Sequence, residues 1–167
     1  MRTDRSRGAP AGARVLVAGL GNVCFGDDGF GVAVADRVAR MELPPAARVV
    51  SFGVRGLELL RALDGKLELL VALEASPRGG SPGTLYVMEA LDGARSGSIE
   101  LPLALAAARA RGIAPRVCVV ACEPADLGAH SGLSAAVHRA VDPAARIVER
   151  LVRRELAGPV VAPRHRG

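Results

Sequence analysis

The chain has 167 residues, half of them apolar, which is enough for one domain with a hydrophobic core. Its formal net charge is +5, but each of two tails, residues 1–13 and 157–167, contributes +2, which leaves +1 for the residues between them. This balance argues against nucleic-acid binding, and no apolar run approaches the roughly 20 residues that a membrane span needs.

The chain begins with a basic tail that lacks the apolar stretch of a signal peptide. We expect both tails to be disordered and residues 14–156 to form a single domain. The first apolar run, residues 14–20, predicts a strand buried on both faces, and residues 29–41 show helical spacing of apolar side chains. Further strands are expected at residues 47–53, 67–75, 84–89 and 116–122, and further helices at residues 55–63, 100–112 and 133–157.

Two of these elements carry additional expectations. The strand at residues 84–89 is predicted to lie at an edge of the sheet, and the last helix is predicted to kink or restart at Pro143. Apolar strands that alternate with helices indicate an α/β three-layer sandwich, in which a mostly parallel sheet has helices on both faces. Ligand sites in such sheets lie beyond the carboxyl ends of the strands. We therefore expect the site among residues 19–31, 53–56 and 74–83 and in the loop after Cys122.

The three cysteines, Cys24, Cys118 and Cys122, do not show the spacing of a metal-binding or redox motif. Cys118 and Cys122 lie within an apolar run, so we expect small buried thiols in a reducing cytoplasm. Zinc or thiol chemistry is the alternative.

The turn after the first strand, GLGNVCFGDDGFG at residues 19–31, is rich in glycine and carries two adjacent acids, Asp27 and Asp28. A dinucleotide site would need glycine where Cys24 stands and an acid at the end of the second strand, which reads SFG instead. Asp27 could cap the following helix while Asp28 favours its positive end. The two glycines after them, however, each cost a helix interior about 1 kcal/mol. Their presence indicates that something approaches the backbone closely.

Glu74 is a second unusual acid, because it follows an apolar run at the carboxyl end of the third strand. One interpretation is an acid that faces water at the end of a strand. The other is that Glu74 converges with the acidic turn at the edge of the sheet. Two carboxylates there would form an anionic pocket suited to a cation or to general acid–base chemistry.

The segment VLVAGLGNVCFGDDGFGVAVADRV, residues 15–38, resembles the opening of the nickel–iron hydrogenase maturation proteases. Their signature is a strand, G-x-G-N, four residues, Asp, Asp or Glu, G-x-G and a helix. The resemblance continues through GVRGLELL at residues 53–60, SPGTL at residues 81–85 and GLS at residues 132–134, in the order of the family. It covers most of residues 15–154.

The resemblance implies a five-stranded sheet between helices and a cytoplasmic endopeptidase. Such an enzyme removes a C-terminal extension from the precursor of the hydrogenase large subunit after nickel insertion. It would carry no metal or other cofactor of its own and would recognise the nickel held by its substrate. The partner is therefore that precursor, with neither nucleic acid nor a membrane involved.

The resemblance also implies three site positions. An acid stands at Asp28, and Glu74 occupies a position where the family usually has Asp. A His that opens the helix after the fourth strand is absent, and Gly97 or Ser98 falls near its place. Asp28 and Glu74 are thus the predicted catalytic and nickel-binding residues, and we expect their carboxylates within about 10 Å of each other.

If the site is active, another donor should occupy the position of the missing imidazole. Ser98, Glu100 and His130 are the candidates, although His130 lies in a different loop. The alternative is a degenerate, non-catalytic relative that binds the hydrogenase subunit or its nickel without cleavage.

Overall fold

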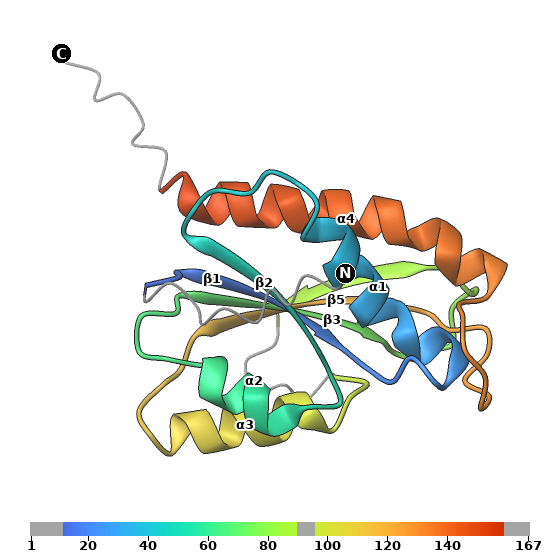
Figure 1. The fold of residues 1–167 in the computed structure, drawn as a ribbon, viewed down its shortest axis with the longest axis horizontal. Coiled ribbons are helices and arrows are strands. Elements are labelled where there is room, and N and C mark those ends of the chain that lie inside the picture. Colours follow the sequence, from blue (N-terminus) through green and yellow to red (C-terminus); the bar gives the residue numbers. More distant parts are fainter. Residues whose placement is uncertain (1–11, 90–95, 159–167) are drawn as a thin grey trace, which may run out of the picture.

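The fold is built on a single sheet, seen in a computed structural model that describes residues 12–89 and 96–158. In these residues five strands lie side by side in the order β2-β1-β3-β5-β4 (Figure 1). Their bounds are β1 Val15–Leu20, β2 Ala47–Gly53, β3 Leu69–Ala75, β4 Leu85–Glu89 and β5 Arg116–Cys122. The four strands β1, β2, β3 and β5 run parallel, and β4 pairs antiparallel with β5. The prediction of a mostly parallel sheet is confirmed.

The position of each strand follows from its side chains. The central strands β1 and β3 are buried along their whole length, as apolar strands covered on both faces must be. The outer strands β2 and β4 are partly exposed, and β4 lies at the edge predicted for it.

Helices cover both faces of the sheet (Figure 1). Their bounds are α1 Phe30–Val38, α2 Gly56–Ala62, α3 Glu100–Arg109 and α4 Ala135–Leu156, and a short 3-10 helix, η1, spans Gly26–Gly29. One core cluster lies between the sheet and α1 with α4, and a second lies between the sheet and α2 with α3. Because the two clusters lie on opposite faces of the sheet, they confirm the three-layer sandwich. Both consist almost entirely of Ala, Val and Leu.

Helix α1 packs unusually close to the sheet, backbone against backbone. A Cβ atom on Gly31 would lie 2.1 Å from the carbonyl oxygen of Leu73 and 2.3 Å from that of Leu20. A Cβ atom on Gly19 would lie 2.6 Å from the carbonyl oxygen of Gly31. Of the two glycines that follow the acids, Gly31 therefore permits a close approach of the sheet, whereas a Cβ atom on Gly29 would lie 3.3 Å from the Cα of Val23 in the turn itself.

Helix α4 runs from Ala135 to Leu156 with Pro143 inside it, so the predicted restart at Pro143 is wrong. Proline removes only one helical hydrogen bond, and its would-be partner four residues earlier, Arg139, is an exposed residue where water can replace the donor. No helix in the described part of the chain is both long and apolar enough to cross a membrane. The predicted disordered tails fall almost entirely outside the described residues.

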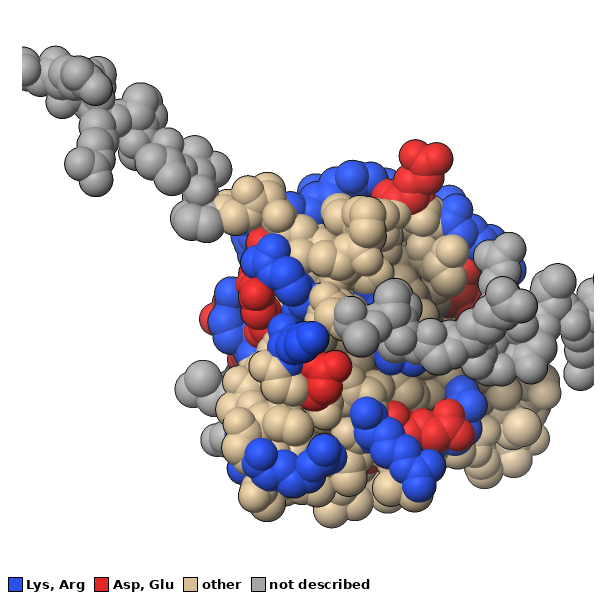
Figure 2. Space-filling model, turned by 60° about the vertical axis from the view of Figure 1, so that its left-hand side comes forward, with Lys and Arg blue, Asp and Glu red and all other residues tan. Residues whose placement is uncertain are grey.

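Charges of both signs lie beside one another at the edge where the strands begin (Figure 2). Arg14 pairs with Glu68 at 2.7 Å and Arg116 with Glu155 at 3.1 Å, joining residues next to the starts of β1, β3 and β5. These exposed ion pairs contribute little stability each. They mix positive with negative charge on this face, where a nucleic-acid surface would gather positive charge alone.

Candidate functional site

The acidic residues of interest gather at the opposite edge, where the parallel strands end. η1 with Asp27 and Asp28 follows β1, and Glu74 lies near the end of β3, the parallel neighbour of β1. Glu74 shares its face of β3 with Leu70 and Ala72, which α2 and α3 cover. The two aspartates instead belong to the turn that leads into α1 on the other face. Both groups therefore lie at one edge of the sheet, and the predicted separation of about 10 Å between the carboxylates of Asp28 and Glu74 stays a prediction.

Asp28 stands on a tightly folded turn. Its Oδ2 accepts a hydrogen bond from the backbone N–H of Asn22 at 2.6 Å. The turn can fold back this far because Gly21 has a φ of +110°, and a Cβ atom there would lie 2.0 Å from the carbonyl oxygen of Asp28. Asp28 is half-buried, so its carboxylate is held in place without being sealed from solvent.

Asp27 is fully buried and has a different task. Its Oδ2 accepts hydrogen bonds from the N–H groups of Ala125 and Asp126 and from Ser134 Oγ, and its Oδ1 accepts one from the N–H of Ser134. Burial would raise the pKa of Asp27, but these hydrogen bonds outweigh it and lower that pKa. No side chain caps the start of η1 or α1, so the interpretation of Asp27 as a helix cap is wrong. Asp27 joins the acidic turn to the loop between β5 and α4.

Glu74 is buried, with only 1 % of its surface exposed, so the interpretation of an acid facing water is wrong. Its Oε1 accepts a hydrogen bond from the N–H of Gly97 at 2.5 Å, and its Oε2 accepts one from Ser96 Oγ at 2.5 Å. The N–H of Ser98 lies 3.4 Å from the same Oε2. Burial raises the pKa of Glu74, and these hydrogen bonds offset the rise only in part.

Replacing the buried Glu74 by glutamine tests the cost of its burial. We expect the variant E74Q to be at least as stable as the native protein at neutral pH. The folded protein binds the Glu74 proton more tightly than the unfolded chain, whose reference pKa is 4.5. The contribution of Glu74 is therefore fully present below that pKa and is lost as the pH rises through the higher folded-state pKa. Urea denaturation from about pH 4 to about pH 8 should show the free energy of unfolding of E74Q gaining on the native value across this window.

The matched control for that measurement is Glu123, a third buried acid at this edge. Burial would raise the pKa of Glu123, but hydrogen bonds, chiefly from the N–H of Arg78 and from Tyr86 Oη, lower it. Its contribution is present above the unfolded-state pKa and is lost as the pH falls, so E123Q should lose stability at neutral pH. A loss of the same sign in E74Q would show that the hydrogen bonds of Glu74 outweigh its burial.

The sequence analysis does not include Glu123, although this residue directly follows the apolar strand β5. Glu74 occupies a similar place, because it is the second-last residue of β3. The carboxylate of Glu123 accepts hydrogen bonds from the N–H groups of Arg78 at 2.8 Å and Gly79 at 3.2 Å and from Tyr86 Oη at 3.0 Å. It thereby fixes the loop between β3 and β4. Three buried carboxylates thus each fix a different loop at this edge, whereas Asp28 is half-buried.

The three residues that the sequence suggests as replacements for an imidazole lie in different places. Ser98 belongs to the Glu74 cluster, where its Oγ is 3.2 Å from Ser96 Oγ. Glu100 begins α3 and packs against Gly56 of α2. His130 pairs through Nε2 with Asp126 Oδ2 at 2.8 Å, in the loop that holds the acidic turn. Within residues 12–89 and 96–158, no group of three or more His, Cys, Asp and Glu side chains is arranged to hold a metal ion.

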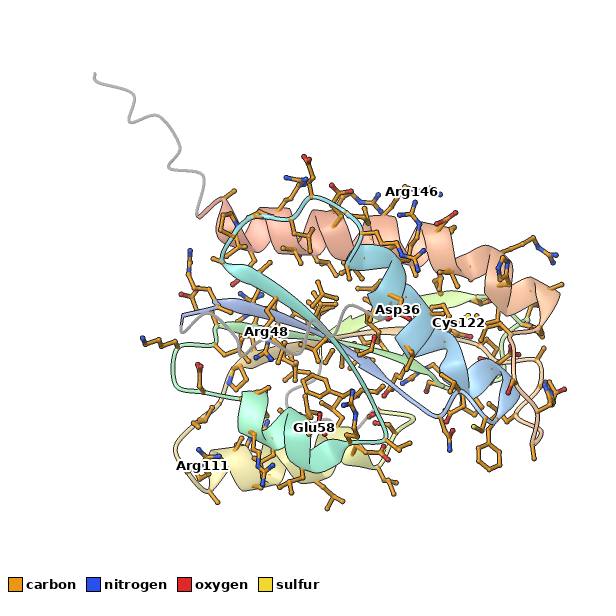
Figure 3. The ribbon with its side chains drawn as sticks, viewed as in Figure 1. Asp36, Arg48, Glu58, Arg111, Cys122 and Arg146 are labelled. Carbon is orange, nitrogen blue, oxygen red and sulfur yellow. The ribbon has the colours of Figure 1, made fainter. Side chains whose placement is uncertain are left out.

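The two thiols of β5 lie in the hydrophobic core. Cys118 and Cys122 are buried and unpaired, as expected, whereas Cys24 is exposed. Cys122, labelled in Figure 3, lies in the layer between the sheet and the helices α1 and α4. Burial, with help from the charges of Asp27 and Glu123, raises its pKa to about 12, so it carries almost no thiolate at neutral pH.

An apolar groove of about 410 Å³ adjoins the Glu74 cluster between α2 and α3. Four large apolar side chains on it are more than half exposed: Val54, Leu57, Ile99 and Leu103. Ile99 directly follows Ser98, so the groove begins where the loop bound to Glu74 ends.

Known proteins share both sequence and fold with the chain. The sequence model of the hydrogenase maturation proteases matches residues 32–151. The hydrogenase expression/formation protein HupD of Rhodobacter capsulatus is 36 % identical over 129 residues, which are 71 % of this chain and 61 % of HupD. A putative hydrogenase maturation protease of Methanocaldococcus jannaschii is 31 % identical over 145 residues, covering 80 % of this chain and 93 % of the relative.

Solved structures agree with these sequence relatives. The hydrogenase maturating endopeptidase HybD from Escherichia coli superimposes with a TM-score of 0.77 at 26 % identity, over 85 % of this chain and 93 % of HybD. A hydrogenase 2 maturation peptidase from a Thaumarchaeota archaeon gives a TM-score of 0.66 at 30 % identity, over 83 % of this chain and 97 % of that one.

Proposed function

Because the chain belongs to the hydrogenase maturation protease family, we propose that it is an endopeptidase that removes a C-terminal extension from the precursor of a nickel-containing hydrogenase large subunit. The observation that carries this proposal is the acidic turn, which presents the half-buried Asp28 at the carboxyl edge of the sheet. The adjoining apolar groove supports a polypeptide substrate, because it offers surface to apolar side chains next to Glu74. The protein would act in the cytoplasm.

Nickel enters this proposal as part of the substrate. Asp28 and Glu74 would grip the nickel that the precursor carries, and the protein would hold no metal of its own. Glu74 already accepts hydrogen bonds on both oxygens and is only 1 % exposed, so the substrate nickel would reach its carboxylate only if residues 96–98 moved aside. Ser96 and Ser98 supply hydroxyl groups beside Glu74, where the family resemblance places an imidazole.

Hydrolysis would then combine the substrate nickel with carboxylates at this edge. The substrate nickel would polarise the scissile carbonyl or activate a water molecule. A carboxylate would accept the proton of the attacking water, and the leaving amine would take up a proton as the C–N bond breaks. Burial raises the pKa of Glu74, so its carboxylate accepts a proton more readily than that of an exposed glutamate.

The test is to mix the purified protein with nickel-loaded precursor and to weigh the large subunit by mass spectrometry. We expect the large subunit to lose the mass of its C-terminal extension. Precursor without nickel should stay uncut, which would support recognition of the substrate nickel. A precursor that forms a stable complex with the protein but keeps its full mass would overturn the endopeptidase and favour the non-catalytic relative.

A further inference from the structure

The acidic turn is attached to a distant part of the chain. Asp27 accepts four hydrogen bonds from residues 98 to 107 positions later, all in the loop between β5 and α4. Their lengths are between 2.7 and 3.0 Å, and three of the four donors are backbone N–H groups. A buried carboxylate with several backbone donors is a strong, directional link between two segments.

Backbone hydrogen bonds run in the opposite direction across the same contact. The N–H of Gly26 donates to the carbonyl of His130 at 2.7 Å, and the N–H of Asp27 donates to the carbonyl of Asp126 at 2.8 Å. The loop itself is braced, because Asp126 accepts from the N–H of Gly128 and pairs with His130. The turn is therefore bound to a loop of defined shape.

The position of Asp28 depends on this link, because one peptide bond joins Asp28 to Asp27. A displacement of Asp27 would shift Asp28 and lengthen its 2.6 Å hydrogen bond from the N–H of Asn22. That N–H group is consequently a local reporter of where the Asp28 carboxylate lies.

We propose that Asp27 is a positioning residue, which fixes the Asp28 carboxylate by locking the acidic turn to the loop between β5 and α4. The part of this proposal that concerns cleavage rests on the proposed function, whereas the geometric part does not. An asparagine in place of Asp27 cannot do the same work, since it has a single acceptor oxygen and its amide group would face backbone donors.

The first test measures the Asn22 amide by NMR in the full chain. In D27N its proton should move towards the chemical shift found in D28N, and its hydrogen exchange should accelerate at least about tenfold. E123Q is the matched control, because Glu123 is also buried and also binds backbone N–H groups, but in a different loop. An Asn22 amide that behaves in D27N as it does in E123Q would overturn the proposal.

The second test is a double-mutant cycle on precursor cleavage, recorded at temperatures where every variant is folded. D27N should lower the cleavage rate at least about tenfold in the native background and should have no further effect in the D28N background. E123Q should change the rate by the same factor in both backgrounds. Equal effects of D27N in both backgrounds would show that Asp27 contributes only general stability.

These measurements distinguish a failure of the proposed function from a failure of the positioning role of Asp27. If the native protein leaves nickel-loaded precursor uncut, the proposed function fails while the Asn22 amide still decides the positioning role. If D27N does not fold, S134A takes its place, because Ser134 Oγ donates to Asp27 at 2.9 Å. S134A should shift the Asn22 amide in the same direction by a smaller amount, and an unchanged amide would contradict the proposal.

Discussion

Replacing Asp28 by asparagine should lower the rate of precursor cleavage about a hundredfold or more while the protein stays folded. Asparagine has the size of aspartate and can still accept the hydrogen bond from the N–H of Asn22, so the loss of stability should be about 1 kcal/mol. The negative charge, which would hold the substrate nickel, is what the variant removes. Rates from mass spectrometry and melting temperatures from circular dichroism check the two halves of this prediction.

The control for D28N is D64N. Asp64 is also an aspartate that accepts a backbone hydrogen bond, from Lys66 at 2.9 Å, but it precedes β3 at the opposite edge of the sheet. D64N should cleave at the native rate. E74Q should lose cleavage together with D28N, because two carboxylates that share one ion act as a unit. Native rates in both D28N and E74Q would leave the protease in place and remove the proposed site.

Gly31→Ala should destabilise the protein by about 3 kcal/mol, which corresponds to a fall in melting temperature of about 10 °C. The added methyl group would meet two backbone carbonyl oxygens, of Leu73 and Leu20, at 2.1 and 2.3 Å. Backbone atoms in the centre of a sheet cannot move aside as a flexible side chain can, so α1 must shift away from β1 and β3. Alanine favours a helix over glycine by about 1 kcal/mol, which is too little to compensate.

Gly65→Ala is the matched control, because it adds the same methyl group where no atom lies within 4 Å. Gly65 is exposed in the loop before β3, and the change there should stay below about 1 kcal/mol. Chemical denaturation of both variants gives the comparison. A Gly31→Ala protein as stable as Gly65→Ala would mean that the contact between α1 and the sheet is looser than the structure shows.

Local patterns in the sequence were sufficient for the elements and their order. The strands at residues 47–53 and 116–122 were predicted with the observed bounds, because a short run rich in valine between turn residues leaves few alternatives. The carboxyl edge followed from the parallel sheet, which places the ends of β1 and β3 together.

The hydrogen bonds of the site could not be predicted in the same way, because they join segments far apart in the chain. Asp27 looked like a helix cap because its partners stand about a hundred residues later. Glu74 looked like an exposed acid because the segment that covers it, residues 96–98, returns from beyond β4. A one-dimensional pattern indicates that an acid stands at a strand end, but it does not indicate which backbone donors fold over it.

The hydrogen bond between Tyr86 and Glu123 gives the protein an optical probe of one loop. Tyr86 is the only tyrosine, and the chain has no tryptophan, so its near-ultraviolet absorption changes on alkaline titration come from a single phenol. Burial, and next the neighbouring Glu123, raise the pKa of Tyr86 above its usual value of 10.0. A spectrophotometric titration therefore reports whether the loop between β3 and β4 is closed over Glu123, without any label and with no other phenol or indole to subtract.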